Sequence, residues 1–291
     1  MAVPHSEAPR LPGTALIAAS SVLFAAMAVL ARTLAGAMSA GQLVVIRFAF
    51  GLVAVGALFA VRRKGPRMPR LGLLALRGLL GGSAVYFYFL AIETVGVGPA
   101  TLLNYTAPAY AAVFAVLFLR ERVSAHLIGA LVLATAGAMV VAASTLGEHP
   151  FTLAGGAWAG LLSALLAGAA MVSVRGLRHD TDAPTVFLSF CVFGGLVGLP
   201  FAAARWVPLT WALLWPALGV GLLSFVAQLL YTHAFAYVTA SVGSAVTQLT
   251  PVVSWALAVL LLDEPARPLT LLGAVVCLAG VLWGALAGRR H

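Results

Sequence analysis

The feature that most constrains this chain is an internal duplication. Shifting the sequence by 143 residues aligns it with itself, without a gap, over nearly its whole length. Coincidences of Ala, Leu, Val and Gly mean little in so apolar a chain, but Arg, Glu, Tyr and Pro are scarce. The matched pairs are Ser20 with Ser163, Arg32 with Arg175, Gly51 with Gly194, Arg62 with Arg205, Tyr88 with Tyr231, Pro108 with Pro251, Glu121 with Glu264, and Gly137 with Gly280. We therefore divide the chain into two repeats, residues 1–146 and 147–291.

The composition places both repeats in a membrane. Hydrophobic residues make up 62% of the chain and charged residues 9%, which is more apolar surface than the core of a soluble domain would hide. Ten apolar runs approach the ~20 residues that a helix needs to span ~30 Å of hydrocarbon. The predicted spans lie at about 14–34, 39–61, 71–92, 97–119, 124–143, 153–174, 183–203, 212–235, 239–262 and 269–287.

The number of spans determines how the repeats are oriented. Each repeat has five crossings, and because five is odd, the second repeat enters the membrane upside down relative to the first. The expected fold is an all-α integral membrane protein with ten transmembrane helices arranged as two inverted five-helix repeats. This architecture is typical of secondary transporters, in which a site near the bilayer midplane is exposed alternately to each side.

The basic residues predict the topology. If the N-terminus is cytoplasmic, that side receives twelve of the 17 Lys and Arg, and the outer side receives only Arg32, Arg205 and Arg267. Positive loops favour the cytoplasm, so we expect a multi-pass protein of the cell inner membrane with both termini inside. The basic residues form short bands beside lipid headgroups, and nucleic acid is not an expected partner.

One motif occurs once in each repeat. Residues 103–123 read LNYTAPAYAAVFAVLFLRERV, and residues 246–266 read VTQLTPVVSWALAVLLLDEPA. Each is an apolar helix with a Pro near its middle and a Glu thirteen positions later. With the ten spans and the Arg47-Phe48 pair, the chain resembles an EamA-type member of the drug/metabolite transporter superfamily. The resemblance covers essentially the whole chain and implies a carrier of small molecules with a cavity lined by spans one, three, four, six, eight and nine.

The repeated Pro and Glu have physical explanations of their own. Pro108 and Pro251 remove a backbone donor and clash with the preceding turn, which bends a helix. Because they recur at the same place, we interpret them as gating kinks, although static kinks are common in membrane proteins. Glu121 and Glu264 are more simply explained as solvated helix ends beside arginines that are near in sequence.

Polar residues inside the spans suggest where a substrate would bind, since each costs free energy unless it faces the bundle interior. Ser224, Gln228 and Tyr231 share one face of span eight, and we expect that face to line a cavity. Packing or hydrogen bonding between helices explains any one polar residue as well as substrate contact does. The other candidate substrate-binding residues are Tyr86, Tyr88, Asn104, Tyr105, Trp158, Ser163 and Gln248.

Charges inside the spans are few and all basic. Arg47 lies about nine residues into its span, ~13 Å from the outer end at 1.5 Å per residue, and is interpreted either as an inter-helix clamp or as a counter-charge for an anionic substrate. Arg77 is close enough to its span end to reach the cytoplasmic interface. All eight acidic residues fall in loops or at span ends, which disfavours a cationic substrate.

We therefore expect transport, with export favoured, of a small metabolite such as an amino acid or another carboxylate-bearing solute. Vitamin or cofactor uptake and drug efflux are the alternatives among transporters. An intramembrane lipid-modifying enzyme would need paired acidic metal ligands or a nucleophile beside a base. The chain has none of these at usable spacing, so no catalytic residue, metal or cofactor is expected. A non-transporting scaffold is the remaining alternative.

Span ten also carries a stripe of small residues, Gly280, Gly284 and Gly288. Such stripes let helices approach closely. We expect this stripe to pack on span five or to join two copies in a homodimer.

Overall fold

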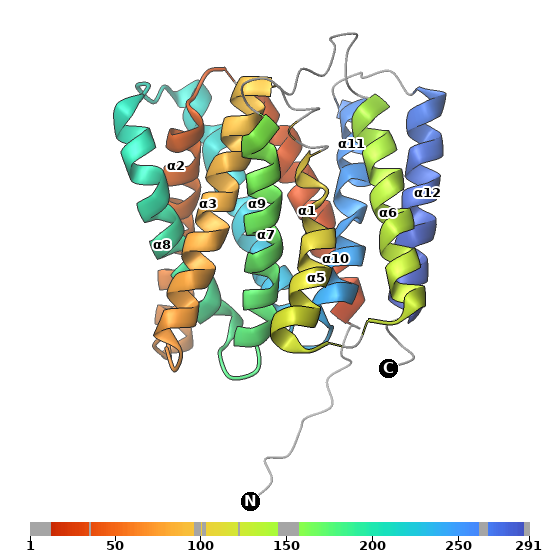
Figure 1. Ribbon diagram of the computed structural model, residues 1–291. Helices are drawn as coiled ribbons and strands as arrows, with labels where there is room; N and C mark the ends of the chain where they lie inside the picture. The colour runs from red at the N-terminus through yellow and green to blue at the C-terminus, as the bar shows by residue number, and fades with distance from the viewer. Residues whose placement is uncertain are drawn as a thin grey trace, which may run out of the picture.

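The computed structural model describes residues 13–34, 36–95, 100, 103–121, 123–144, 157–261 and 267–287 of the 291-residue chain. This part of the chain folds as a single bundle of α-helices (Figure 1). The helices are α1 (Gly13–Thr33), α2 (Ala40–Arg62), α3 (Leu71–Val95), α5 (Ala107–Leu119), α6 (Ala125–Ser144), α7 (Ala157–Leu177), α8 (Ala183–Ala204), α9 (Trp211–Ala234), α10 (Ala240–Thr247), α11 (Leu249–Leu261) and α12 (Pro268–Ala287).

The bundle has the dimensions of a multi-pass membrane protein. Eight segments are long and apolar enough to cross a bilayer, and α5 and most of α6 form two shorter apolar helices beside them. α10 and α11 together make one of the eight segments, and they replace the single continuous helix that the sequence predicted. The expectation of an all-helical membrane fold is confirmed.

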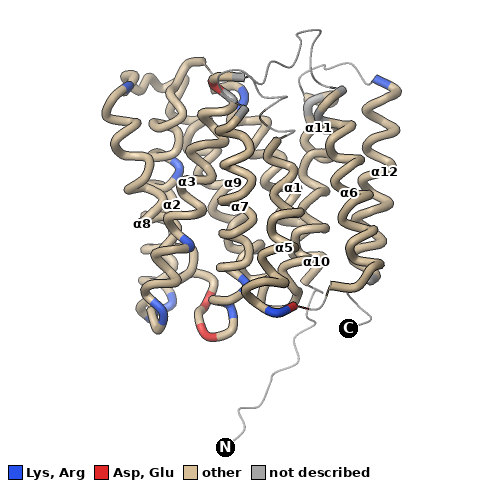
Figure 2. The backbone as a smooth tube through the Cα atoms, viewed as in Figure 1, with Lys and Arg blue, Asp and Glu red and all other residues tan. Residues whose placement is uncertain are grey.

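Charge is distributed toward the ends of the bundle. Figure 2 shows Lys and Arg mainly at the end where α1 begins and α12 ends. Blue also appears inside the bundle on α2 and α3, which carry the buried Arg47 and Arg77.

Side-chain caps determine where several helices begin. Ser39, Asp182 and Thr239 precede α2, α8 and α10, and each side-chain oxygen accepts a bond from the backbone N–H three residues later, at 3.3, 3.2 and 3.2 Å. Such caps are worth about 0.5–2 kcal/mol each. These helices begin within one residue of the predicted span starts.

The small-residue stripe of span ten packs within the chain. A Cβ at Gly280 would lie against the backbone of Ala134 on α6, and one at Gly137 would lie against the backbone of Cys277 on α12. Gly284 is also buried there, close to Ala130, whereas Gly288 lies outside the described residues. A homodimer through this stripe would have to displace α6.

The remaining helices pack in pairs that surround the middle of the bundle. α3 packs along α7, α1 along α9, and α2 along α8. α5 lies against α7, and α11 lies against α1. Residues of the two broken segments, before α5 and between α10 and α11, line the same cavity.

The expectation of a solvated end for Glu121 is wrong. Its carboxylate, 12% exposed, accepts hydrogen bonds from the Ala240 N–H at 2.9 Å and the Ser241 hydroxyl at 3.2 Å, and lies 3.8 Å from Nε of Arg175. The first turn of α10 favours this negative charge because its N–H groups have no intrahelical partners. Glu121 therefore ties the end of α5 to α7 and α10, while Glu264 lies outside the described residues.

Candidate substrate cavity

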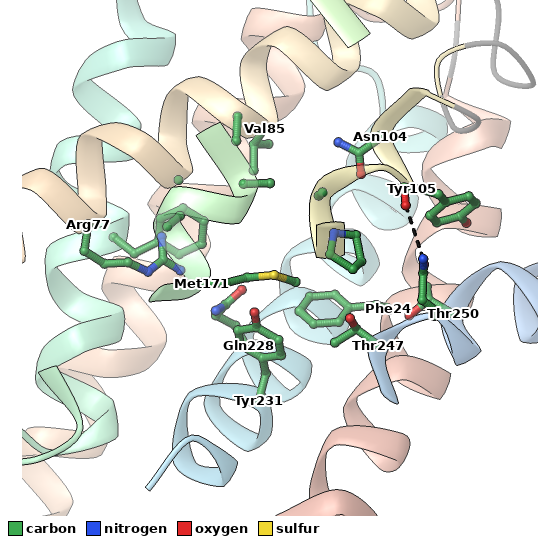
Figure 3. Close-up of a pocket in the computed structure, with 18 of the residues that line it drawn as sticks. Phe24, Arg77, Val85, Asn104, Tyr105, Met171, Gln228, Tyr231, Thr247 and Thr250 are labelled. Carbon is green, nitrogen blue, oxygen red and sulfur yellow. Dashed lines mark hydrogen bonds between the residues drawn. The ribbon is translucent and has the colours of Figure 1, made fainter. Parts of the chain in front are cut away.

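A cavity of about 240 Å³ lies among the helices, with walls from both halves of the chain (Figure 3). Ligand pockets commonly enclose roughly 300–1,000 Å³, so this one suits a small solute. Its lining residues are Phe24, Arg47, Arg77, Gly81, Ala84, Val85, Asn104, Tyr105, Ala107, Pro108, Ala167, Ala170, Met171, Phe190, Gln228, Tyr231, Thr247, Gln248 and Thr250. The six spans that the resemblance implied all contribute, and α2 and α8 add one residue each.

The two helix breaks form one wall of the cavity. The chain turns at Tyr105 before α5 begins, and Pro108 lies in the first turn of α5, where a missing N–H costs little. The second break is at Gln248, three residues before Pro251. The predicted kinks are thus complete interruptions, and Pro108 lines the cavity whereas Pro251 is buried beside it.

The breaks contact each other directly. The Gln248 side-chain amide donates to the backbone oxygen of Tyr105 at 3.2 Å, drawn as the dashed line in Figure 3, and to the Thr135 hydroxyl at 2.9 Å. Cys277 donates to the Gln248 carbonyl at 3.1 Å. The amide of Gln248 is therefore committed to structure, although the residue also lines the cavity.

Asn104 and Ser163 belong to one hydrogen-bonded chain. The Asn104 amide donates to the Ser163 hydroxyl at 2.7 Å, and this hydroxyl donates to the Ala84 carbonyl at 2.8 Å. Ser163 is fully buried behind the wall, while Asn104 reaches the cavity. Ser163 thus holds Asn104 in place and joins α7 to α3.

On α9, two of the three predicted residues line the cavity. Gln228 and Tyr231 reach it, and Figure 3 shows both side chains rising toward Met171. Ser224 is buried against α1, where its hydroxyl lies 2.9 Å from the Met27 sulfur. The amide of Gln228 has only a long 3.4 Å contact, to a threonine of its own helix, which leaves it available to a ligand.

Three predicted aromatic residues lie outside the cavity lining. Tyr86 stacks on Phe201 with ring centroids 3.8 Å apart. Trp158 is 54% exposed on the outside of the bundle, and Tyr88 packs among apolar residues of α1, α2 and α8. The aromatic rings that line the cavity instead include Phe24 and Phe190, which no pattern in the sequence distinguishes from the other phenylalanines.

Arg77 is the largest departure from the expectations. Instead of reaching the interface, its side chain is 4% exposed and its guanidinium points into the cavity (Figure 3). The Cζ atom lies 4.2 Å from the ring centroid of Phe190. Among the described residues, Nε and Nη1 have no hydrogen-bond partner.

Arg47 occupies the same end of the cavity. It is 7% exposed, and its Cζ atom lies 6.0 Å from the Phe190 centroid and 5.7 Å from that of Phe48. A buried cation at membrane depth costs about 2.5–3.5 kcal/mol on insertion scales, and cation–π contacts return only about 0.5–2 kcal/mol. This end of the cavity therefore attracts negative charge.

The acidic side chains of the described residues are all committed elsewhere. Glu93 pairs with Arg205 at 2.8 Å, Asp180 pairs with Arg70 at 2.8 Å, and Asp182 caps α8. With Glu121 at the start of α10, each lies at a helix end or in a loop. None of the lining residues is acidic.

Comparisons with known proteins agree with this architecture. The model of the EamA-like transporter family matches residues 11–143 and 154–284. The chain belongs to the EamA-like transporter family. It is therefore a multi-pass membrane transporter of the drug/metabolite kind.

Individual EamA relatives resemble it over different lengths. The pseudopaline exporter from two strains of Pseudomonas aeruginosa is 29% identical over 241 residues, which cover 79% of this chain and 80% of the exporter. An uncharacterized transporter of Helicobacter pylori is 28% identical over 172 residues, 56% of each chain. One crystal structure superposes with a TM-score of 0.83 at 19% identity, covering 96% of this chain and 98% of the other, which shows the shared fold.

Proposed function

We propose that this protein is an inner-membrane secondary transporter that exports a small carboxylate-bearing metabolite, such as an amino acid, by alternating access around the cavity. The observation that carries the proposal is the charge of the cavity, which has Arg47 and Arg77 at one end and no acidic lining residue. A cation entering this cavity would meet repulsion and no carboxylate to offset its lost hydration. A carboxylate would meet donors that match its geometry.

Alternating access is supported by the composition of the cavity wall. Many lining residues occur as pairs separated by the 143-residue offset of the duplication, so the cavity lies where the two repeats meet. The pairs are Phe24 with Ala167, Arg47 with Phe190, Val85 with Gln228, Asn104 with Thr247, Tyr105 with Gln248, and Ala107 with Thr250.

The helix pairings point to the same symmetry. Under the 143-residue offset, the contact of α3 with α7 corresponds to that of α9 with α1, and the contact of α5 with α7 to that of α11 with α1. These correspondences favour ten spans in two inverted repeats, 1–146 and 147–291, related by a pseudo-two-fold axis through the cavity.

We assign substrate contact to the predicted polar residues that line the cavity. These are Asn104, Tyr105, Gln228, Tyr231 and Gln248, together with the two arginines. Tyr86, Tyr88, Trp158, Ser163 and Ser224 support the wall from behind or lie outside it. The helix breaks beside Pro108 and Pro251 act as the hinges that open the cavity to either side.

The proposed direction of transport is inferred from a relative. The Pseudomonas aeruginosa protein is named as an exporter, and it covers most of this chain. With the N-terminus and C-terminus both cytoplasmic, export would move substrate from the side where α1 begins to the opposite side. The family and its relatives make an intramembrane enzyme or a non-transporting scaffold the weaker alternatives.

Counterflow in proteoliposomes tests the proposal. Vesicles loaded with an unlabelled amino-acid or dicarboxylate mixture should accumulate the labelled solute that the protein carries, and a quaternary ammonium dye should not accumulate. Inside-out membrane vesicles should take up the same solute if the protein exports it. Uptake of the dye without any carboxylate-bearing solute would refute the proposal, and chemical turnover of lipid without flux would support an enzyme.

A further inference from the structure

The cationic end of the cavity narrows the class of substrate. This step rests on the proposed function and extends it. We infer that the substrate carries two carboxylates, which bind Arg47 and Arg77 beside the Phe190 ring, while its uncharged polar part lies against the helix breaks.

Arg77 has the geometry of a ligand-binding group. Its guanidinium Cζ lies over the Phe190 ring, 4.2 Å from the ring centroid. The N–H groups of a guanidinium donate in its own plane, and they can form a two-pronged bond to a carboxylate. Nε and Nη1 of Arg77 have no hydrogen-bond partner among the described residues, so part of the donor capacity of this buried guanidinium is unsatisfied.

A glycine makes room for this conformation. Gly81 lies one helical turn after Arg77 on α3, and a Cβ there would occupy the place of the Arg77 Nη1 atom and crowd the Phe190 ring. A side chain at this position would therefore displace the guanidinium from the ring. The backbone of α3 would not have to move, because the nearest atom is the end of a flexible side chain.

Arg47 supplies the second positive charge next to the first. Its Cζ lies 6.0 Å from the same Phe190 ring, approached from α2 rather than α3. Neither arginine is ion-paired to a carboxylate among the described residues, whose acidic side chains all lie at helix ends or in loops. One bound carboxylate would leave one of the two buried cations uncompensated, whereas two carboxylates would neutralise both.

The opposite end of the cavity has no formal charge. Asn104, Thr247 and Thr250 lie there, away from Arg77 in Figure 3, and present amide and hydroxyl groups. A substrate that fits both ends has its carboxylates on one side and neutral hydrogen-bonding groups on the other. A dicarboxylate with a short polar extension has this distribution.

The test compares glutarate with its monoamide, glutaramate, on the full-length protein in nanodiscs. The two probes have nearly the same size, and only the number of negative charges differs. Isothermal titration should show glutarate binding at least tenfold more tightly than glutaramate, with a matching difference in thermal protection. Equal binding of the two, or binding of neither, overturns the inference, and the first result would mean that both arginines clamp one carboxylate.

Variants assign the selectivity to Arg77. Arg77→Gln should bring the glutarate-to-glutaramate ratio close to one while glutaramate still binds, and Arg77→Lys should keep part of the preference. Gly81→Ala should lower the ratio with little change in melting temperature. Gly72→Ala is the matched control, because it lies on the same helix and a Cβ there meets nothing within 4 Å. An unchanged ratio in both Arg77→Gln and Gly81→Ala refutes the assignment.

The proposed function and the inference about two carboxylates can be refuted independently. If counterflow detects exchange of monocarboxylates but nanodisc binding shows no diacid preference, the proposed function stands and this inference falls. If no solute is exchanged in counterflow, the proposed function itself falls, whatever the binding ratio.

Discussion

The side-chain amide nitrogen of Gln248 lies 3.2 Å from the backbone oxygen of Tyr105, which occupies the aligned position 143 residues earlier. The bond joins the two helix breaks at the cavity wall. Each break leaves backbone groups without intrahelical partners at membrane depth, and such groups are tolerated only where protein or a cavity satisfies them. Gln248 thus contacts Tyr105, its counterpart in the other half of the chain, at the cavity wall where the proposed alternating access would require the two halves to move relative to each other.

Replacing Gln248 with Leu should destabilise the fold. The change leaves the Tyr105 carbonyl and the Thr135 hydroxyl without their donor, and interhelical hydrogen bonds in membranes are worth about 0.6–2 kcal/mol. Thermal unfolding in detergent should show a melting temperature lowered by several degrees. Gln228→Leu is the control, since its amide has only a 3.4 Å contact, and it should weaken substrate binding instead. Equal melting temperatures for the two variants would contradict this division of roles.

Replacing Pro108 or Pro251 with Ala should slow transport several-fold while the protein still folds. Ala restores a backbone donor and permits the helix to continue through the break, which stiffens the proposed hinge. Initial rates of counterflow measure the effect. Pro200→Ala, at an exposed position inside α8, is the matched control and should transport normally. Normal rates in both hinge variants would show that the breaks are static.

Glu121→Gln should lower the local stability of the bundle where α5, α7 and α10 meet. The neutral amide loses the attraction of Arg175 and of the α10 N-terminus, and caps of this kind contribute about 0.5–2 kcal/mol. Hydrogen exchange should increase in the first turn of α10. Glu93→Gln removes the exposed pair with Arg205, in which the arginine side chain is 75% exposed, and should change stability by little. Similar exchange in the two variants would rule out a special role for Glu121.

Much of this architecture is readable from the sequence because lipid imposes it. The apolar runs and the depth of Arg47 follow from hydrocarbon thickness and from the cost of burying charge, and the duplication is visible in the sequence itself. The face that each helix turns toward the cavity does not, because a helix that is apolar all round carries no stripe to orient it. Tyr86 and Trp158 were therefore selected for residue type, and their side chains lie outside the cavity lining.

Arg77 shows that contacts between helices distant in sequence are also hard to predict from the sequence. Its distance from the span end suggested a side chain that extends to water. The structure holds it inward through Gly81, four residues away, and Phe190, which belongs to the other half of the chain. The glycine alone is uninformative in a chain with 30 of them. The buried environment of Glu121 is equally hard to predict, because its partners lie on helices that are distant in sequence.

Gly280→Leu should separate α6 from α12. A Cβ at Gly280 already meets the backbone of Ala134, so a larger side chain forces the helices apart, and overpacking of this kind costs about 1–3 kcal/mol. The melting temperature should fall, whereas Gly56→Leu, where a Cβ meets nothing within 4 Å, should be tolerated. Cysteines placed at Ala134 and Gly280 should cross-link only within one chain. A cross-linked dimer would instead support a homodimer through this stripe.

The last prediction concerns topology. α1 begins and α12 ends at the same end of the bundle (Figure 1), and the α2–α3 connection at that end carries Arg63, Lys64 and Arg67. Positive loops remain in the cytoplasm, so a reporter fused after Ala287 should be active only there. A fusion in the connection between α8 and α9, after Val207, should be active only outside. Activity of the Ala287 fusion outside the cytoplasm would imply an odd number of crossings and would remove the inverted repeat on which alternating access depends.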